Sequence, residues 1–218
     1  MKKTVLFIAI TLFTLNGFAQ GFGINAAYNM AKMKLAYDGA EEGIQYKKSL
    51  GSIGFSINYD YEISENLFIS SGINYIQKGV RYFVKDNGDT WDFKMKMNYL
   101  DIPILIKYNF EIGDETYLYG KFGPSLGITL GGKAIDKSIY ENGSEDVDKY
   151  DLKFGSDKYK NDYKSGDFGL NFGAGVIYNN IEIGINYYSG MKNLGLFEKQ
   201  DYKHKVFSLV VGYRFNLE

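Results

Sequence analysis

The strongest constraint on this 218-residue chain is an alternation of apolar with small or polar residues that recurs between turns. The last segment shows the pattern most clearly, and its apolar members are Phe207, Leu209, Val211, Tyr213, Phe215 and Leu217. Because successive side chains of a β-strand point to opposite faces, such a segment has one apolar face and one polar face. The pattern therefore predicts a fold built mainly of β-strands.

About eight segments carry the pattern, each of roughly ten residues or slightly more, the length that a tilted strand needs to cross a bilayer. They cover 22–30, 53–61, 67–75, 100–110, 118–130, 168–178, 181–187 and 207–217. Short turns alternate strictly with long, charged connections, which are 32–49, 79–97, 131–165 and 190–205. Barrels of the bacterial outer membrane alternate in this way, with short periplasmic turns and long external loops.

We therefore predict an all-β fold, an eight-stranded antiparallel up-and-down transmembrane barrel of the smallest size class, with both ends in the periplasm. The residues that alternate with the apolar ones, here called the polar parity, are mainly Gly, Asn and Ser. This composition suits the crowded, wet interior of a small barrel. A soluble exported barrel of the lipocalin type is the alternative, because it also has one apolar face. The chain has no Cys, so hydrogen bonds and burial alone must hold either barrel together.

Residues 1–19 are predicted to be a secretory signal peptide. Lys2 and Lys3 precede an apolar run over 5–15, and the small residues Gly17 and Ala19 follow it. The run is too short for a transmembrane helix. Residues 20–218 then form one outer-membrane barrel domain of a Gram-negative bacterium. Without the two lysines, 23 basic residues face 26 acidic ones, and no basic excess indicates a nucleic-acid partner.

Five charged residues of the polar parity fall at a similar depth when the segments are aligned on their short turns. They are Asp60, Lys107, Lys121, Glu182 and Arg214. The interior of an eight-stranded barrel is just filled by side chains, and buried charges must be paired. We therefore predict a charge network that fills the lumen near the short turns. A narrow proton or ion path is the alternative interpretation.

Tyrosines near the ends of the segments are predicted to form two girdles, because Tyr prefers the membrane interfaces. The girdle near the short turns would contain Tyr61, Tyr108, Tyr178 and Tyr213. The girdle near the long connections would contain Tyr28, Tyr75 and Tyr187.

Signals for catalysis, cofactors or metals are weak. The acidic stretch 145–151 has oxygen ligands at a spacing suited to Ca²⁺, but it lacks the fixed Gly and the terminal Glu of an EF-hand loop. His204 is the only histidine, lies in the last long connection, and has no Cys to join it in a metal site. No catalytic motif is present. We predict that the protein is not an enzyme and has no catalytic, cofactor-binding or metal-binding residues.

The segment 99–108, YLDIPILIKY, resembles the YLEIPLLLKY segment of the PorT-like outer-membrane β-barrel family. The segment 117–124 is similar to the YLxAGP strand of that family, and the resemblance extends over nearly all of 20–218. It implies a porin-family barrel, and the family includes a component of a protein-secretion system. Its matching positions are structural, so it implies no catalytic or binding residues. The end of the chain departs from the usual barrel pattern, because Glu218 is not aromatic.

The expected partners are membrane lipids and, during biogenesis, the barrel-assembly machinery. A protein partner would bind through the external loops, because binding residues tend to lie on loops held by a rigid scaffold. We therefore predict a structural or loop-mediated binding role, with the ligand unidentified. The alternatives are a secretion component, a narrow passive pore and a soluble lipocalin-like binder.

Overall fold

The computed structural model describes residues 20–41 and 46–217; the predicted signal peptide lies outside them. No helix in these ranges is long and apolar enough to span a membrane. The strands are β1 (Gln20–Tyr37), β2 (Ala40–Glu41), β3 (Lys47–Lys48), β4 (Leu50–Ser64), β5 (Leu67–Asp86), β6 (Asp89–Gly113), β7 (Thr116–Ile139), β8 (Glu145–Asp151), β9 (Asp167–Tyr178), β10 (Ile181–Gly190) and β11 (Gln200–Leu217).

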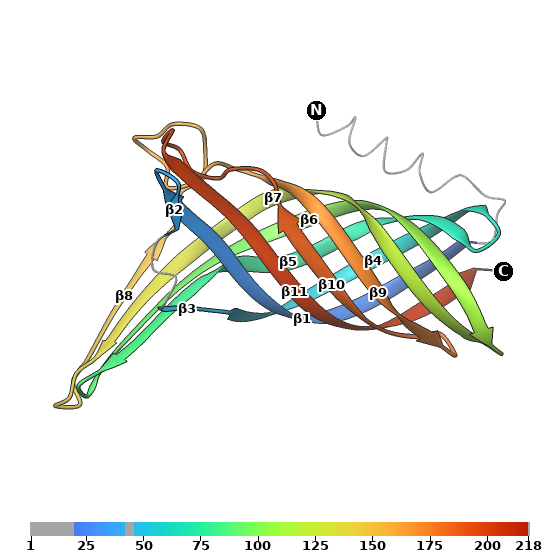
Figure 1. Ribbon diagram of the computed structural model, residues 1–218, viewed down its shortest axis with the longest axis horizontal. Helices are drawn as coiled ribbons and strands as arrows, with labels where there is room; N and C mark the ends of the chain where they lie inside the picture. The colour runs from blue at the N-terminus through green and yellow to red at the C-terminus, as the bar shows by residue number, and fades with distance from the viewer. Residues whose placement is uncertain (1–19, 42–45, 218) are drawn as a thin grey trace.

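Eight of the described strands form a closed antiparallel ring in the order β1-β4-β5-β6-β7-β9-β10-β11. The ring closes because β11 pairs with β1 over the whole length of both strands, from Gln20 opposite Leu217 to Tyr37 opposite Gln200. The first and last of these strands begin and end at the same end of the barrel (Figure 1). The predicted eight-stranded antiparallel barrel is confirmed.

The three short connections of the ring lie together at one end, here called the short-turn end. Asn66, Glu115, Asn179 and Asn180 take positive φ angles in these turns. Asn visits this left-handed region more readily than most residues. Asn179 and Asn180, with φ of 44° and 69°, form a two-residue hairpin turn of the type that matches strand twist. The opposite end is called the long-loop end.

The apolar parity faces outward and the polar parity faces the lumen. Ile57 and Ile183 are each 62% exposed, whereas Asn25, Asp60 and Ser208 are buried. The outward residues form a continuous apolar belt, made of the outward positions within 22–30, 53–61, 67–75, 100–110, 118–130, 168–178, 181–187 and 207–215. The exposed tyrosines at its margins include Tyr28 and Tyr187 on one side and Tyr108, Tyr178 and Tyr213 on the other.

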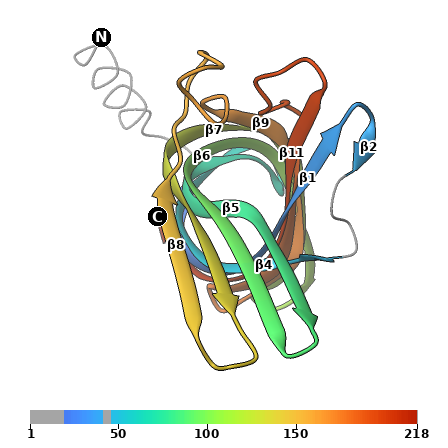
Figure 2. The same cartoon turned by 90° about the vertical axis from the view of Figure 1, so that its left-hand side faces the viewer.

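All four predicted long connections are wrong in part, because each contains strand residues, and the difference is largest in 79–97 and 131–165. β5 and β6 stay paired from Lys78 opposite Met97 to Asp86 opposite Asp89. β7 and β8 pair from Lys133 opposite Asp151 to Ile139 opposite Glu145. These stretches, 78–86, 89–97, 133–139 and 145–151, extend beyond the ring as a sheet that we call the arm (Figures 1 and 2). The turn at Asn87 and Gly88, with φ of 45° and 92°, closes its first hairpin.

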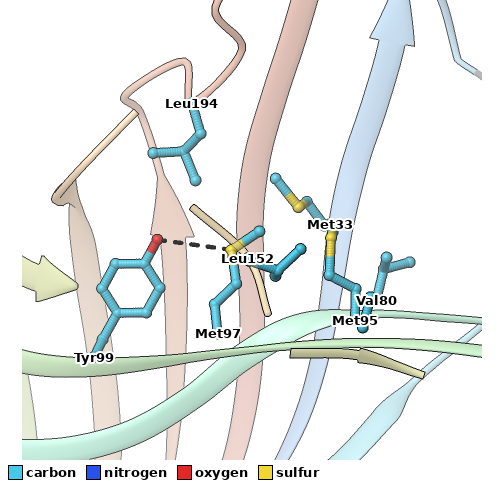
Figure 3. Packing of buried hydrophobic residues seen from close by; sticks show 8 residues of the cluster. Met33, Val80, Met95, Met97, Tyr99, Leu152 and Leu194 are labelled. Atoms are coloured by element: carbon cyan, nitrogen blue, oxygen red, sulfur yellow. Dashed lines mark hydrogen bonds between the residues drawn. The ribbon is translucent and has the colours of Figure 1, made fainter. Parts of the chain in front are cut away.

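An apolar cluster lies where the arm meets the ring, and we call it the apolar plug (Figure 3). Its buried members are Met33, Val80, Met95, Met97, Tyr99, Ala134, Leu152 and Leu194. Leu152 follows β8 and Leu194 follows β10, so the segments after these strands fold back over the long-loop end. Full burial of a large apolar side chain contributes about 1.5–3 kcal/mol, so the plug anchors both the arm and these segments.

Replacing Ile104 or Leu209 with Arg should lower the free energy of unfolding in a lipid bilayer by about 2–4 kcal/mol, because both side chains meet lipid near the middle of the belt. Ile112, outward-facing beyond the belt at the short-turn end, is the matched control; Ile112→Arg should cost about 0–1 kcal/mol. Urea unfolding in lipid vesicles measures the free energy of unfolding of all three variants. Equal effects at the three positions would contradict the assignment of the outward face.

Candidate functional site

The five predicted charge-network residues lie together in the lumen near the short-turn end. Lys107 Nζ donates a hydrogen bond to Asp60 Oδ2 at 2.8 Å, and Lys121 Nζ lies 3.5 Å from Glu182 Oε1. Arg214 joins the two pairs, because Nη1 donates to Glu182 Oε2 at 2.8 Å and Nη2 contacts Asp60. Glu182 and Lys107 are almost fully buried. We call these five residues the short-turn ion cluster.

Small residues on the lumen side make room for this cluster. Its members come from β4, β6, β7, β10 and β11, whereas β9 contributes glycines. A Cβ atom added at Gly173 would clash with the Lys121 side chain, and one added at Gly175 would clash with the Tyr119 hydroxyl. Gly184 on β10 is likewise covered by Tyr119. The Gly-rich parity of the sequence therefore accommodates the long side chains that cross the lumen from β7.

A polar cavity of about 70 Å³ follows the short-turn ion cluster along the lumen. Its polar lining consists of Asn25, Asn29, Ser56, Asn58, Ser70, Asn74, Lys121, Asn171, Asn186 and Ser208. Asn29 accepts a hydrogen bond from Ser208 at 2.7 Å, and Asn25 donates to Ser56 at 3.4 Å. A cavity with this lining offers water many hydrogen-bonding partners.

A second buried ion cluster, which the sequence analysis missed, lies closer to the long-loop end. Lys78 Nζ is 2.9 Å from Asp101 Oδ2 and 3.0 Å from Asp167 Oδ2. The same ammonium lies 3.7 Å from the ring centroid of Tyr188 and 4.8 Å from that of Tyr99, within the range of cation–π attraction. We call Lys78, Asp101 and Asp167 the long-loop ion cluster. Asp101 could have been found, because, like Lys107, it is a charged residue at a polar position of the predicted strand 100–110.

His204 is not in a loop, contrary to the sequence analysis. It lies in β11 with no exposed surface, and its ring makes an edge contact with Tyr99 at 5.5 Å between centroids. Within the described part of the chain, neither ring nitrogen has a hydrogen-bond partner. His204 lies beyond the apolar belt. Burial lowers the pKa of His204 to about 4, although the nearby Asp167 opposes this shift, so the imidazole is neutral at pH 7.

The acidic stretch 145–151 forms strand β8, so its carboxylates alternate between two faces of the arm. Two of its acids are paired across to β7: Glu145 accepts a hydrogen bond from Lys137 at 2.8 Å, and Asp151 lies 3.7 Å from Lys133. In the ranges that the structure covers, no group of three or more His, Cys, Asp or Glu side chains could hold a metal ion. The carboxylates of this stretch are therefore spread along a strand instead of converging on one point.

Comparison with known proteins agrees with this architecture. A family model described as "Outer membrane protein beta-barrel domain" matches residues 17–195. None of the curated proteins matches the chain.

Several solved structures are similar over most of the chain. The attachment invasion locus protein Ail of Yersinia pestis is 20% identical, with 90% of this chain and 98% of that chain covered and a TM-score of 0.35. Neisserial surface protein A is 16% identical, with 91% and 100% covered and a TM-score of 0.43. OprG of Pseudomonas aeruginosa is 14% identical, with 91% and 97% covered and a TM-score of 0.46.

Replacing Lys78 with Met should lower the free energy of unfolding by about 3–5 kcal/mol, because the buried carboxylates of Asp101 and Asp167 lose the ammonium group that they share. Adding Asp101→Asn to this variant should recover part of the loss. Lys199→Met is the control, since Lys199 pairs with Asp38 at an exposed site and the change should cost at most about 1 kcal/mol. Equal losses for Lys78→Met and Lys199→Met in urea unfolding would show that the long-loop ion cluster is not a buried network.

Acidification should destabilise the protein through His204. The unfolded imidazole binds a proton near pH 6.5 and the folded one near pH 4, so the free energy of unfolding falls as the pH drops through this window. The loss attributable to His204 should be about 3 kcal/mol, because each unit of difference in pKa between the folded and unfolded states corresponds to about 1.4 kcal/mol. His204→Phe keeps a ring against Tyr99 and should remove this component. Identical pH profiles of unfolding for both proteins would contradict the assignment.

Proposed function

Because the chain belongs to the outer membrane protein β-barrel domain family and lies in the outer membrane of a Gram-negative bacterium, we propose that it is a closed, non-catalytic scaffold that presents a protein-binding surface on its arm. The observation that carries this proposal is the arm itself, a sheet that extends beyond the apolar belt and ends in the strand β8. Outer-membrane barrels keep their short turns in the periplasm, so the arm faces the cell exterior.

The free edge of β8 is suited to pairing with another strand. All seven residues of β8 are exposed, and within the described residues only β7 pairs with it. The Tyr140 N–H donates to Ser144 O at 2.9 Å and the Leu152 N–H donates to Gly132 O at 2.9 Å. Because antiparallel hydrogen bonding alternates along a strand, the backbone groups of Val147 and Lys149 point away from β7. An extended segment of a partner could add to the sheet there.

Aromatic side chains on the arm would extend such a contact. Tyr82, Trp91 and Phe93 lie on the same face, with ring centroids 6.1–6.4 Å apart. Trp91 is partly exposed, and its indole nitrogen donates to Asp136 Oδ1 at 2.7 Å. Tyr and Trp are enriched among the residues that contribute most to protein interfaces. These side chains support a polypeptide partner for the arm.

The contents of the lumen support a barrel that binds instead of conducting. Two ion clusters, a small polar cavity and the apolar plug follow one another along its length. Each layer fills the narrow interior that eight strands leave. These observations weigh against the narrow passive pore.

A photo-reactive amino acid placed at Val147 in living cells should form a covalent adduct with a protein partner, because the free edge of β8 is accessible. The same group placed at Ile112, at the short-turn end, is the control for barrel biogenesis contacts. Lys149→Pro removes an outward N–H and should abolish the adduct, whereas Lys149→Gln removes only the charge and should preserve it. Heat-dependent gel migration verifies that each variant is assembled.

The proposal is overturned if no arm position yields an adduct with an assembled barrel. It is also overturned if the purified protein gives a large, steady conductance in planar bilayers, since the closed lumen would then be wrong.

We further propose that the protein belongs to the PorT-like branch of these barrels. The segment Tyr99–Tyr108 supports this, and it lies in β6 with Tyr99 and Asp101 facing the lumen and Ile102 and Ile104 facing outward. A role in protein secretion is a binding role of the same class. Identification of secretion components in the Val147 adduct would support it, and adducts with unrelated proteins alone would exclude it.

A further inference from the structure

Two outward-facing pairs of lysines lie directly opposite one another across neighbouring strands at the margin of the apolar belt. Lys32 on β1 lies opposite Lys205 on β11, and Lys96 on β6 lies opposite Lys133 on β7. Like charges directly opposite one another destabilise a sheet. A negatively charged group between the two ammonium groups of each pair would relieve this repulsion.

Both pairs lie just past the apolar belt on the long-loop side. Lys32 follows the outward residue Met30 by two positions, and Lys205 precedes Phe207 by two. On β6, the outward residue Asn98 separates Lys96 from Leu100, the last residue of the belt. This is the depth at which lipid headgroups meet a membrane protein.

The two pairs lie on opposite sides of the barrel. In the ring order β1-β4-β5-β6-β7-β9-β10-β11, the β11–β1 seam and the β6–β7 seam are separated by equal numbers of strands in both directions. A single soluble anion could not contact both pairs, whereas a lipid leaflet surrounds the barrel and reaches both seams.

The next lysine pair along the same seam provides the contrast. Lys34 lies opposite Lys203, and Asp201 contacts both ammonium groups, at 2.8 and 2.9 Å. Across 20–41 and 46–217, no carboxylate contacts Lys32, Lys205 or Lys96. Lys133 has only an exposed Asp151 at 3.7 Å. The protein thus neutralises the pair farther from the belt with one close carboxylate, whereas at the belt margin Lys133 alone has an acidic contact, and that contact is longer and exposed.

We propose that the Lys32–Lys205 and Lys96–Lys133 pairs bind the phosphate groups of outer-leaflet lipids. A phosphate placed between two ammonium groups accepts charge-assisted hydrogen bonds from both and converts their repulsion into attraction. The acyl chains of the same lipid would lie on the belt, against Met30 and Phe207. This continuity with the belt favours a phosphorylated lipid over free phosphate. This inference rests on the proposed membrane orientation, and it does not depend on whether the arm binds a protein partner.

The test compares double variants of the full-length protein purified in neutral detergent. Lys32→Gln/Lys205→Gln and Lys96→Gln/Lys133→Gln each remove one pair, and Lys34→Gln/Lys203→Gln removes the same charge one step farther from the belt. Native mass spectrometry measures retention of added lipid A. Each of the first two variants should weaken binding at its seam about tenfold or more, and the third should change it less than about twofold.

Thermal unfolding gives a second measurement. If the lysine pair had a purely structural role, its effect on the unfolding temperature would not depend on lipid A. In vesicles of phosphatidylcholine alone, Lys32→Gln/Lys205→Gln should raise the unfolding temperature, because it removes repulsion. In vesicles that also contain lipid A, the same double variant should have a lower unfolding temperature than the parent protein. If the double variant does not assemble, Lys32→Gln alone carries the same two measurements.

Three results would overturn the proposal. Equal weakening by all three double variants would show general surface charge instead of two sites. Unchanged lipid A retention in both pair variants would remove the sites altogether. Equal protection of the parent protein by inorganic phosphate and by lipid A would show that the pairs take free phosphate and not lipid. None of these results bears on the adduct formed at Val147.

Discussion

Every backbone N–H and C=O group that faces lipid must find a partner within the protein, and this requirement determines the rest of the structure. The pairing of β1 with β11 meets it by closing the sheet on itself. Closure of eight strands leaves an interior only wide enough for side chains. The lumen must therefore be packed, and an unpaired strand edge such as that of β8 can exist only beyond the apolar belt.

The charges in the lumen balance over its whole length, not within each cluster. The short-turn ion cluster has three bases and two acids, and the long-loop ion cluster has one base and two acids. With His204 neutral, the eight charged side chains together carry no net charge. The polar cavity lies beside the first cluster, because Lys121 contributes to both. The two clusters thus form one electrostatic unit in which each offsets the excess of the other.

The ring was predictable from the sequence because lipid requires outward apolar side chains at every second position of each spanning strand. The short-turn ion cluster was predictable because tight turns fix the depth of Asp60, Lys107 and Lys121.

The arm was missed because the alternation of apolar and polar residues reverses its phase at the belt margin. On β6 the apolar residues face outward at Leu100 and Ile102 but inward at Met95 and Met97. A strand leaving lipid for water turns its apolar side inward, so the reversal reads as the end of a strand. His204 and Lys78 were misplaced or missed for the same reason.

The acidic composition of β8 has a consequence for how the protein behaves in a crowded membrane. Copies in one membrane share their orientation and diffuse in a plane, so exposed strand edges at equal height would meet often and stack into sheets. Four acids and one lysine among the seven residues of β8 make two such edges repel each other. The repulsion leaves each copy separate while its edge stays open, so the strand resists self-association without being covered.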